Sequence, residues 1–195
     1  MLKFRNVTFS YPGTKRPVLE DLSFSVQPGS FTAVIGASGS GKSTLLKTLY
    51  DIVEFPLEID AGKVILSGTK NGKDFSFESG EIRKSWWNQI SYVPQAAQSV
   101  LNPIVRLKDQ FLDSVPRESK DEKPEETIAR VARYMEGLGL SPDVLDAFPF
   151  QLSGGMRQRA VIALATFMSP NVVLADEPTT ALDVVVQRGI LMMLM

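Results

Sequence analysis

Residues 36–43 read Gly36-Ala37-Ser38-Gly39-Ser40-Gly41-Lys42-Ser43 and fit the pattern G-x-x-x-x-G-K-[ST]. The apolar run Phe31–Ile35 before them predicts a short strand, and the apolar spacing of Lys42–Tyr50 predicts a helix. Glycines permit backbone conformations closed to other residues, so successive N–H groups can face one concavity and hold phosphate oxygens. The alternative is a glycine-rich turn with an exposed lysine. The order strand, loop, helix favours a phosphate-binding P-loop.

The polar side chains at the end of this loop have separate predicted tasks. Lys42 reaches the β- and γ-phosphates of a nucleoside triphosphate, and the Ser43 hydroxyl joins the coordination of Mg²⁺. Thr44 adds a contact to the α-phosphate. The predicted phosphate-binding set is therefore Gly36, Ala37, Ser38, Gly39, Ser40, Gly41, Lys42, Ser43 and Thr44.

Two acidic residues follow a second apolar run. Val172–Ala175 predicts a buried strand that delivers Asp176 and Glu177 at its carboxyl end, where open α/β sheets place their ligand crevice. Asp176 is predicted to hold Mg²⁺ through its water shell, and Glu177 to polarise the water that attacks the γ-phosphate. The alternative is that both acids cap the turn at Pro178–Thr180. A P-loop earlier in the chain favours the catalytic interpretation.

Composition excludes several kinds of chemistry. The 195 residues include neither Cys nor His, so disulfides, thiolate zinc sites, cysteine nucleophiles and imidazole bases are ruled out. The 21 basic and 22 acidic residues give a net charge of -1, which offers little electrostatic support for nucleic acid binding. No apolar run approaches the roughly 18 residues of a membrane span, and Met1–Gly13 lacks a signal peptide's apolar region. We therefore expect a folded cytosolic chain without a nucleic acid partner.

Alternation and helical spacing predict the remaining elements. The segments Thr69–Gly80 and Arg117–Glu126 are polar or charged, and the second is expected to be a solvated loop. Strands are predicted at Leu2–Tyr11, Val18–Val26, Lys63–Leu66 and Ile90–Val93, and helices at Glu78–Lys84, Leu107–Val115, Thr127–Leu138, Ser153–Met168 and Val184–Met195.

Residues 152–159 open the helix at Ser153–Met168 and read Leu-Ser-Gly-Gly-Met-Arg-Gln-Arg. This stretch resembles the signature motif of ATP-binding-cassette (ABC) ATPases, with Met156 where glutamine is common. The resemblance implies that Ser153, Gly154 and Gly155 grip the γ-phosphate of ATP held by an opposite subunit, in a head-to-tail dimer with two ATP molecules. Without the family, Ser153 is only a good helix N-cap.

Three further positions match the family's order. Tyr11 resembles the aromatic residue that stacks on adenine, although a strand-end tyrosine is equally compatible with core packing. Gln95 resembles the glutamine that contacts Mg²⁺ and the attacking water and senses the membrane partner; otherwise it is a polar loop residue. Asp183 resembles the D-loop aspartate that meets the other subunit's P-loop, and it is alternatively an N-cap for the last helix.

The resemblance covers the whole chain and implies an α/β fold, a P-loop NTPase (ABC ATPase) core with an antiparallel β subdomain and an inserted α-helical subdomain. Residues 1–195 then form a single ABC ATPase domain, incomplete at the C-terminus. The family's switch histidine would follow Glu177 after one helix and one strand, and residues 178–195 are too few for both. We therefore expect a truncated domain that binds ATP or ADP but hydrolyses ATP slowly or not at all. The antiparallel β subdomain is predicted at 1–30 and 61–77, the core at 31–60, 78–104 and 160–195, and the helical subdomain with the signature motif at 105–159.

Two longer stretches, Gln95–Pro103 and Phe148–Arg159, resemble the oligopeptide/dipeptide/nickel importer branch of the family. This implies an ATP-binding and ATP-hydrolysing importer subunit that couples dimer closure to transport of peptides or a related solute. Its implied partners are an ABC permease, a second ATP-binding subunit in a homo- or heterodimer and, indirectly, a solute-binding protein. The implied location is peripheral, on the cytoplasmic face of the cell membrane.

Three alternative functions share parts of these motifs. A nucleotide-binding fragment or regulatory module with little hydrolysis is the main alternative, because the switch-histidine region is absent. An ABC-type ATPase of DNA repair would carry coiled-coil arms between the P-loop and the signature motif, and no sustained heptads occur there. A GTPase would carry an Asn-Lys-x-Asp motif, which this sequence lacks.

Overall fold

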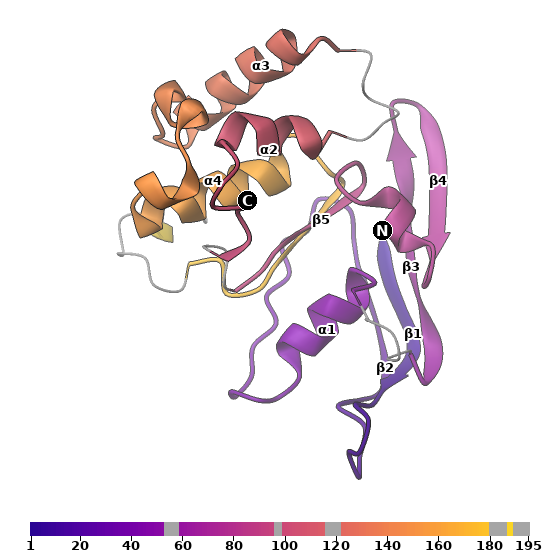
Figure 1. Ribbon diagram of the computed structural model, residues 1–195. Helices are drawn as coiled ribbons and strands as arrows, with labels where there is room; N and C mark the ends of the chain where they lie inside the picture. The colour runs from indigo at the N-terminus through magenta and orange to yellow at the C-terminus, as the bar shows by residue number, and fades with distance from the viewer. Residues whose placement is uncertain (53–58, 96–98, 116–121, 180–186, 189–195) are drawn as a thin grey trace. The chain divides into compact units, whose positions relative to one another are not determined.

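The computed structural model describes residues 1–52, 59–95, 99–115, 122–179 and 187–188 (Figure 1). The chain divides into two compact units, Met1–Trp86 and Trp87–Met195, called unit 1 and unit 2 below. No helix within the described ranges is both long and apolar enough to span a lipid bilayer. The α/β fold class expected from the sequence is confirmed, and the predicted subdomain boundaries stay a prediction.

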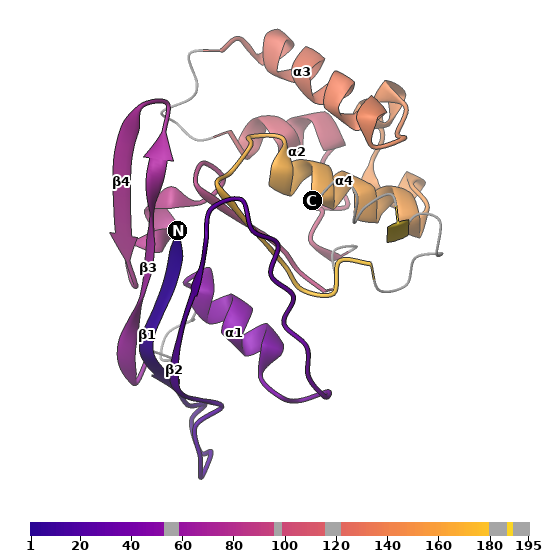
Figure 2. The ribbon, with the colours of Figure 1, turned by 180° about the vertical axis from the view of Figure 1, so that it is seen from behind.

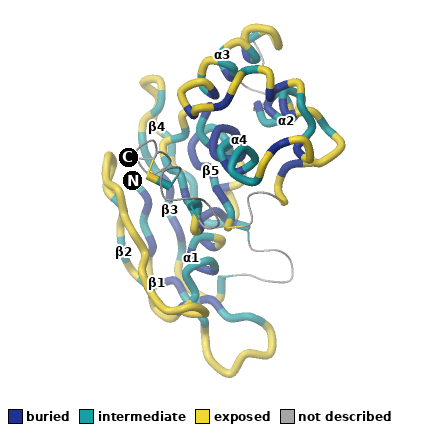
Figure 3. The backbone as a smooth tube through the Cα atoms, turned by 90° about the vertical axis from the view of Figure 1, so that its left-hand side faces the viewer, coloured by how far each residue is buried: buried dark blue, intermediate teal, exposed yellow. Residues whose placement is uncertain are grey.

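Unit 1 is built on a four-stranded antiparallel sheet in the order β2-β1-β3-β4. The buried residues of β1 alternate on either side of a register shift at Arg5–Asn6, and Phe4 lies between Phe24 and Val64 of its two neighbours. The Phe4 and Phe24 rings stack with their centroids 4.9 Å apart. In Figure 3, β1 is largely buried while the edge strand β2 is largely exposed. The strands are β1 (Leu2–Phe9), β2 (Leu19–Val26), β3 (Ala61–Lys70) and β4 (Lys73–Glu78).

Strand β4 was not predicted, because Thr69–Gly80 was interpreted as a polar segment without an element. Phe75 and Phe77 alternate with polar residues along it, as on a half-exposed edge strand. Asn71 and Gly72 both have positive φ, 52° and 73°, and they turn β3 back into β4. An Asn-Gly pair before an alternating run is a strong hairpin signal, so this strand was detectable from sequence. The helix predicted at Glu78–Lys84 is reduced to a 3-10 turn at Ile82–Ser85.

The strand predicted at Phe31–Ile35 is wrong. These residues have no regular secondary structure, and Ile35 is 92% exposed. A strand requires a hydrogen-bonded neighbour as well as an apolar run, and none of the described strands pairs with this segment. The helix predicted after the glycine-rich loop is confirmed as α1 (Lys42–Leu49), which lies beside the sheet of unit 1 in Figures 1 and 2.

Unit 1 ends in an aromatic contact that accounts for one of the two tryptophans. Trp86 stacks on Tyr50 with ring centroids 4.7 Å apart and an interplanar angle of 3°. Its indole N–H donates to the Tyr50 carbonyl at 2.9 Å. Trp86 therefore packs against the residue that follows α1.

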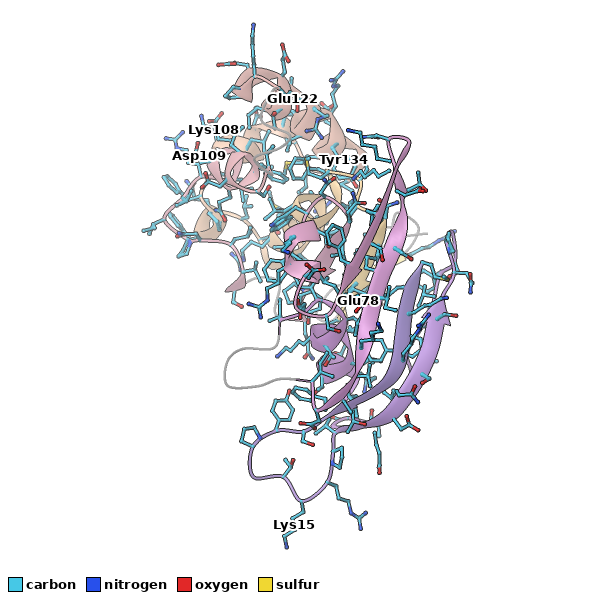
Figure 4. The ribbon with its side chains drawn as sticks, turned by 90° about the vertical axis from the view of Figure 1, so that its right-hand side faces the viewer. Lys15, Glu78, Lys108, Asp109, Glu122 and Tyr134 are labelled. Carbon is cyan, nitrogen blue, oxygen red and sulfur yellow. The ribbon has the colours of Figure 1, made fainter. Side chains whose placement is uncertain are left out.

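At the other end of the unit, Lys15 lies at the tip of the loop joining β1 and β2 (Figure 4).

Unit 2 pairs two short parallel strands, β5 (Ile90–Val93) and β6 (Val172–Ala175), both of which were predicted. Helix α4 contacts β5, and α2 and α3 contact each other, so the helices share one apolar core. Phe111 and Phe167 meet edge to face within it. The helices are α2 (Leu107–Asp113), α3 (Pro124–Gly137) and α4 (Gly154–Thr166), with 3-10 turns at Pro142–Asp146 and Pro149–Gln151.

Candidate functional site

The glycine-rich loop of unit 1 folds around the Lys42 ammonium. Lys42 Nζ donates to the carbonyl oxygens of Gly36 at 2.9 Å and Ala37 at 2.8 Å. Gly41 precedes α1 with a φ of +89°, a conformation that glycine adopts without the steric cost of a Cβ. All residues from Gly36 to Ser40 are exposed, so their amides are open to a ligand. The predicted loop thus occupies the N-terminal end of α1, where the helix dipole favours an anion.

Tyr11 is brought to the same helix. Its hydroxyl lies 3.2 Å from the Thr44 Oγ1, in the first turn of α1. Its ring meets Phe9 edge to face, with centroids 5.0 Å apart, and the residue is only partly buried. The structure therefore places the aromatic residue predicted for adenine beside the threonine predicted for the α-phosphate.

The predicted catalytic acids follow β6 in unit 2, at the carboxyl end of the parallel pair. Asp176 is 5% exposed, whereas Glu177 is exposed. Gln95, which follows β5, donates from Nε2 to the Glu177 Oε2 at 3.0 Å. Gln95 and Glu177 were predicted to act on the same attacking water, and the strand pairing brings their side chains together.

Tyr92 contacts one of the predicted site residues, Asp176, and the sequence did not indicate this contact. Its hydroxyl donates to the Asp176 Oδ2 at 3.2 Å. Burial raises the pKa of Tyr92 well above its ordinary value, and the neighbouring Asp176 carboxylate raises it further. The hydroxyl therefore stays protonated at neutral pH and remains a donor. No signal in the sequence pairs residues so far apart, because the contact depends on the register of β5 and β6.

Gln158 is a second residue that the sequence analysis assigned no role. This side chain of α4 is 2% exposed, and its Nε2 donates to the Pro178 carbonyl at 2.6 Å. The neighbouring Glu177 has a φ of +48°, a conformation that costs energy for a residue with a Cβ. The buried amide thus ties the helix of the signature motif to the turn that carries Glu177.

The signature motif begins α4, as predicted. Ser153 is the N-cap, and its Oγ accepts a hydrogen bond from the Met156 N–H at 3.3 Å. Ser153 is exposed, and Gly154 and Gly155 form the first turn. The N-cap role is therefore present in the structure, while the contact of this motif with a γ-phosphate stays a prediction.

The carboxylate oxygens of Asp176 fit a magnesium ion that also binds phosphate. Oδ2 accepts from Tyr92, and within the described ranges no hydrogen bond reaches Oδ1, which leaves a carboxylate oxygen for a hard cation. The described residues contain no group of three or more acidic side chains that would hold a metal by themselves. Mg²⁺ is commonly held by one or two carboxylates together with substrate phosphates and water.

Some predicted residues lie outside the described ranges. These are Asp183, most of the predicted last helix, and residues 96–98 of the stretch that resembles the importer branch. Their predicted roles stay predictions.

Comparison with known proteins agrees with the resemblance in the motifs. The ABC transporter family model matches residues 19–180. Dipeptide transport ATP-binding protein DppD of Caldanaerobacter subterraneus subsp. tengcongensis is 37% identical over 90% of this chain and 53% of its own length. Oligopeptide transport ATP-binding protein OppD of Escherichia coli is 34% identical over 99% and 56%. The chain spans about half the length of the first curated relatives it matches. These relatives confirm the predicted resemblance to the oligopeptide/dipeptide branch.

Solved structures agree with the sequence relatives. The dimeric structure of MJ0796, described as a bacterial ABC transporter cassette, is 28% identical and superposes with a TM-score of 0.82 over 100% of this chain and 81% of that chain. A post-hydrolysis state of the same cassette, bound to ADP and Pi, superposes equally well. The chain therefore belongs to the ABC transporter family and has the fold of an ATP-binding cassette.

Proposed function

We propose that this chain is the ATP-binding and ATP-hydrolysing subunit of an ABC importer. The observation that carries the proposal is the glycine-rich loop at the start of α1, with Lys42 Nζ fixed by two loop carbonyls. An exposed set of amides beside an ammonium group at a helix N-terminus suits a polyphosphate. The family membership and the ADP- and Pi-bound relative support ATP as that polyphosphate.

In unit 1, binding and orientation of ATP fall to four kinds of group. The loop N–H groups donate hydrogen bonds to the phosphate oxygens, and Lys42 neutralises charge on the β- and γ-phosphates. Thr44 contacts the α-phosphate, and Tyr11 offers its ring to the adenine, because its hydroxyl holds it at the first turn of α1. The 3.2 Å between the Tyr11 hydroxyl and the Thr44 Oγ1 supports the proposal that both residues bind the same ATP molecule.

In unit 2, Glu177 orients and polarises the attacking water, and Gln95 holds the Glu177 carboxylate. Mg²⁺, for which Asp176 is the ligand proposed in unit 2, would supply charge neutralisation at the β- and γ-phosphates. The Asp176 side chain is buried, and the Tyr92 hydroxyl donates to its carboxylate.

The second ATP-binding subunit is proposed to meet the signature motif. Ser153, Gly154 and Gly155 present a hydroxyl and exposed or partly exposed amides at the N-terminus of α4, which suits a γ-phosphate held by the other subunit. The dimeric MJ0796 cassette supports a pair of subunits, and the head-to-tail arrangement follows from the resemblance of the motifs.

Exposed apolar side chains of unit 2 are proposed to contact a membrane permease. Ile104 is 80% exposed and Phe150 is 67% exposed. Phe150 stacks on Phe148, and the Arg106 guanidinium lies 5.5 Å from the Phe148 ring centroid. The curated relatives belong to peptide transport systems, which favours a permease as the occupant and a location on the cytoplasmic face of the membrane, with a solute-binding protein as an indirect partner. The test is whether the chain is recovered together with detergent-solubilised permease. Co-recovery supports this assignment, and failure of the chain to co-purify contradicts it.

The function is tested with the unmodified chain under single-turnover conditions, with the chain in excess over radiolabelled ATP and Mg²⁺. We expect ATP to bind in a saturable manner and to be converted to ADP and phosphate. Single turnover is chosen because the sequence predicts slow hydrolysis. Binding without any phosphate formation would contradict the enzymatic part of the proposal, and the absence of binding would contradict all of it.

A further inference from the structure

Strand β5 holds Asp176 at two points. The Asp176 N–H donates to the Val93 carbonyl at 2.8 Å, and the Tyr92 hydroxyl donates to the Asp176 Oδ2 at 3.2 Å. Asp176 is 5% exposed, so its carboxylate has little water to replace a lost partner. Both the backbone and the side chain of Asp176 are thus positioned by the neighbouring strand.

The strand register explains why Tyr92 is the residue that makes this contact. Tyr92 lies opposite Leu174 in the parallel pair. Side chains two residues apart share a face of the sheet, so Asp176 follows Leu174 on the face that Tyr92 occupies. From this position the tyrosine side chain is long enough for its hydroxyl to donate to the Asp176 carboxylate.

We propose that Tyr92 is a positioning residue for magnesium binding, which orients the Asp176 carboxylate so that Oδ1 faces the metal. This inference rests on the proposed function, in which Asp176 is a ligand of Mg²⁺ or of its water shell. Partners that hydrogen-bond to a metal ligand fix its orientation, and removing them typically weakens metal binding by about 10- to 100-fold. Tyr92 acts through Asp176 and needs no contact with the metal or the nucleotide.

The substitution Tyr92→Phe removes only the hydroxyl and keeps the ring in the sheet. The Asp176 Oδ2 then loses its donor in a buried position, and the carboxylate gains rotational freedom. We expect the free Mg²⁺ concentration that half-saturates binding to the nucleotide-loaded chain to rise about tenfold, near the lower end for such partners. Nucleotide affinity in EDTA should stay unchanged, because the phosphate loop lies in unit 1.

The measurement follows the fluorescence of bound mant-ATP in buffers of defined free Mg²⁺. Tyr134→Phe is the matched control, because the Tyr134 hydroxyl also donates to a side chain of unit 2, the Thr166 Oγ1 at 2.8 Å. Tyr134 belongs to α3 and is labelled in Figure 4. This variant loses an equivalent hydroxyl and should keep the wild-type midpoint.

A double variant separates positioning from general destabilisation. Asp176→Asn should raise the Mg²⁺ midpoint strongly, and adding Tyr92→Phe to it should raise the midpoint no further, because both changes act through one carboxylate. An additive effect in the double variant would overturn the inference.

The remaining outcomes distinguish the inference from the function it rests on. If Tyr92→Phe keeps the wild-type midpoint while Asp176→Asn raises it, Asp176 binds Mg²⁺ without help from Tyr92 and the inference fails. If Asp176→Asn leaves the midpoint unchanged, the proposed role of Asp176 fails and the inference fails with it.

Discussion

Replacing Lys42 with alanine is expected to weaken ATP binding by the chain about a hundredfold. A hydrogen bond to a charged group contributes about 1.5–3 kcal/mol, and each 1.4 kcal/mol is about tenfold in affinity. Lys42 also donates to the carbonyls of Gly36 and Ala37, so its loss removes a bridge that shapes the loop. Lys42→Arg should recover only part of the affinity, because a planar guanidinium does not reproduce the contacts of a compact ammonium group.

The measurement is a fluorescence titration of each variant with mant-ATP in the presence of Mg²⁺. Lys47→Ala is the matched control, because Lys47 lies on the exposed face of the same helix and its removal changes the net charge equally. Far-ultraviolet circular dichroism shows whether both variants keep α1. Equal affinities for Lys42→Ala and Lys47→Ala would mean that the loop does not bind the phosphates.

Replacing Glu177 with glutamine is expected to slow ATP hydrolysis by about 10²- to 10⁴-fold, the usual range for loss of a general base. ATP affinity should change little, because the phosphate-binding groups belong to other residues. Glutamine keeps the size of the side chain but cannot accept a proton from water. In the unsubstituted chain the Nε2 of Gln95 donates to the Glu177 carboxylate. The substitution places a neutral amide beside this Nε2.

This prediction is checked by the rate of phosphate formation in a single turnover, with binding measured in the same sample. Glu136→Gln is the control, because Glu136 is an exposed carboxylate near the end of α3 in the same unit. A Glu177→Gln variant that hydrolyses ATP at the wild-type rate would remove Glu177 from the mechanism.

Short-range patterns accounted for most elements of the fold. The apolar runs at Ile90–Val93 and Val172–Ala175 became β5 and β6, and the helical spacing after Ser153 became α4. The phosphate loop was predictable as well, because its glycines and Lys42 are adjacent in the chain. These features depend on local backbone preference and periodicity, which a single sequence contains.

Features that depend on a partner strand were harder to predict. Phe31–Ile35 has the composition of a buried strand, yet the run is exposed and unpaired among the described strands. β4 was missed because its polar residues outweighed the alternation of Phe75 and Phe77 and the Asn71-Gly72 turn. Composition alone does not specify which hydrogen-bonding edge a segment meets.

Contacts near Asp176 and Glu177 between residues far apart in the sequence were also not predictable. Tyr92 meets Asp176, and Gln158 meets the Pro178 carbonyl, through the register of β5 with β6 and the packing of α4. The family motifs predicted a common role for Gln95 and Glu177 but gave no reason to select Tyr92 or Gln158. Such residues are found only once the strands are paired.

The most direct test of the central claim is a map of backbone amide chemical shifts of the chain with and without ADP and Mg²⁺. The account predicts that the largest changes fall on the amides of residues 36–44, because these N–H groups bind the phosphates. Unchanged shifts in this loop at saturating nucleotide would contradict it.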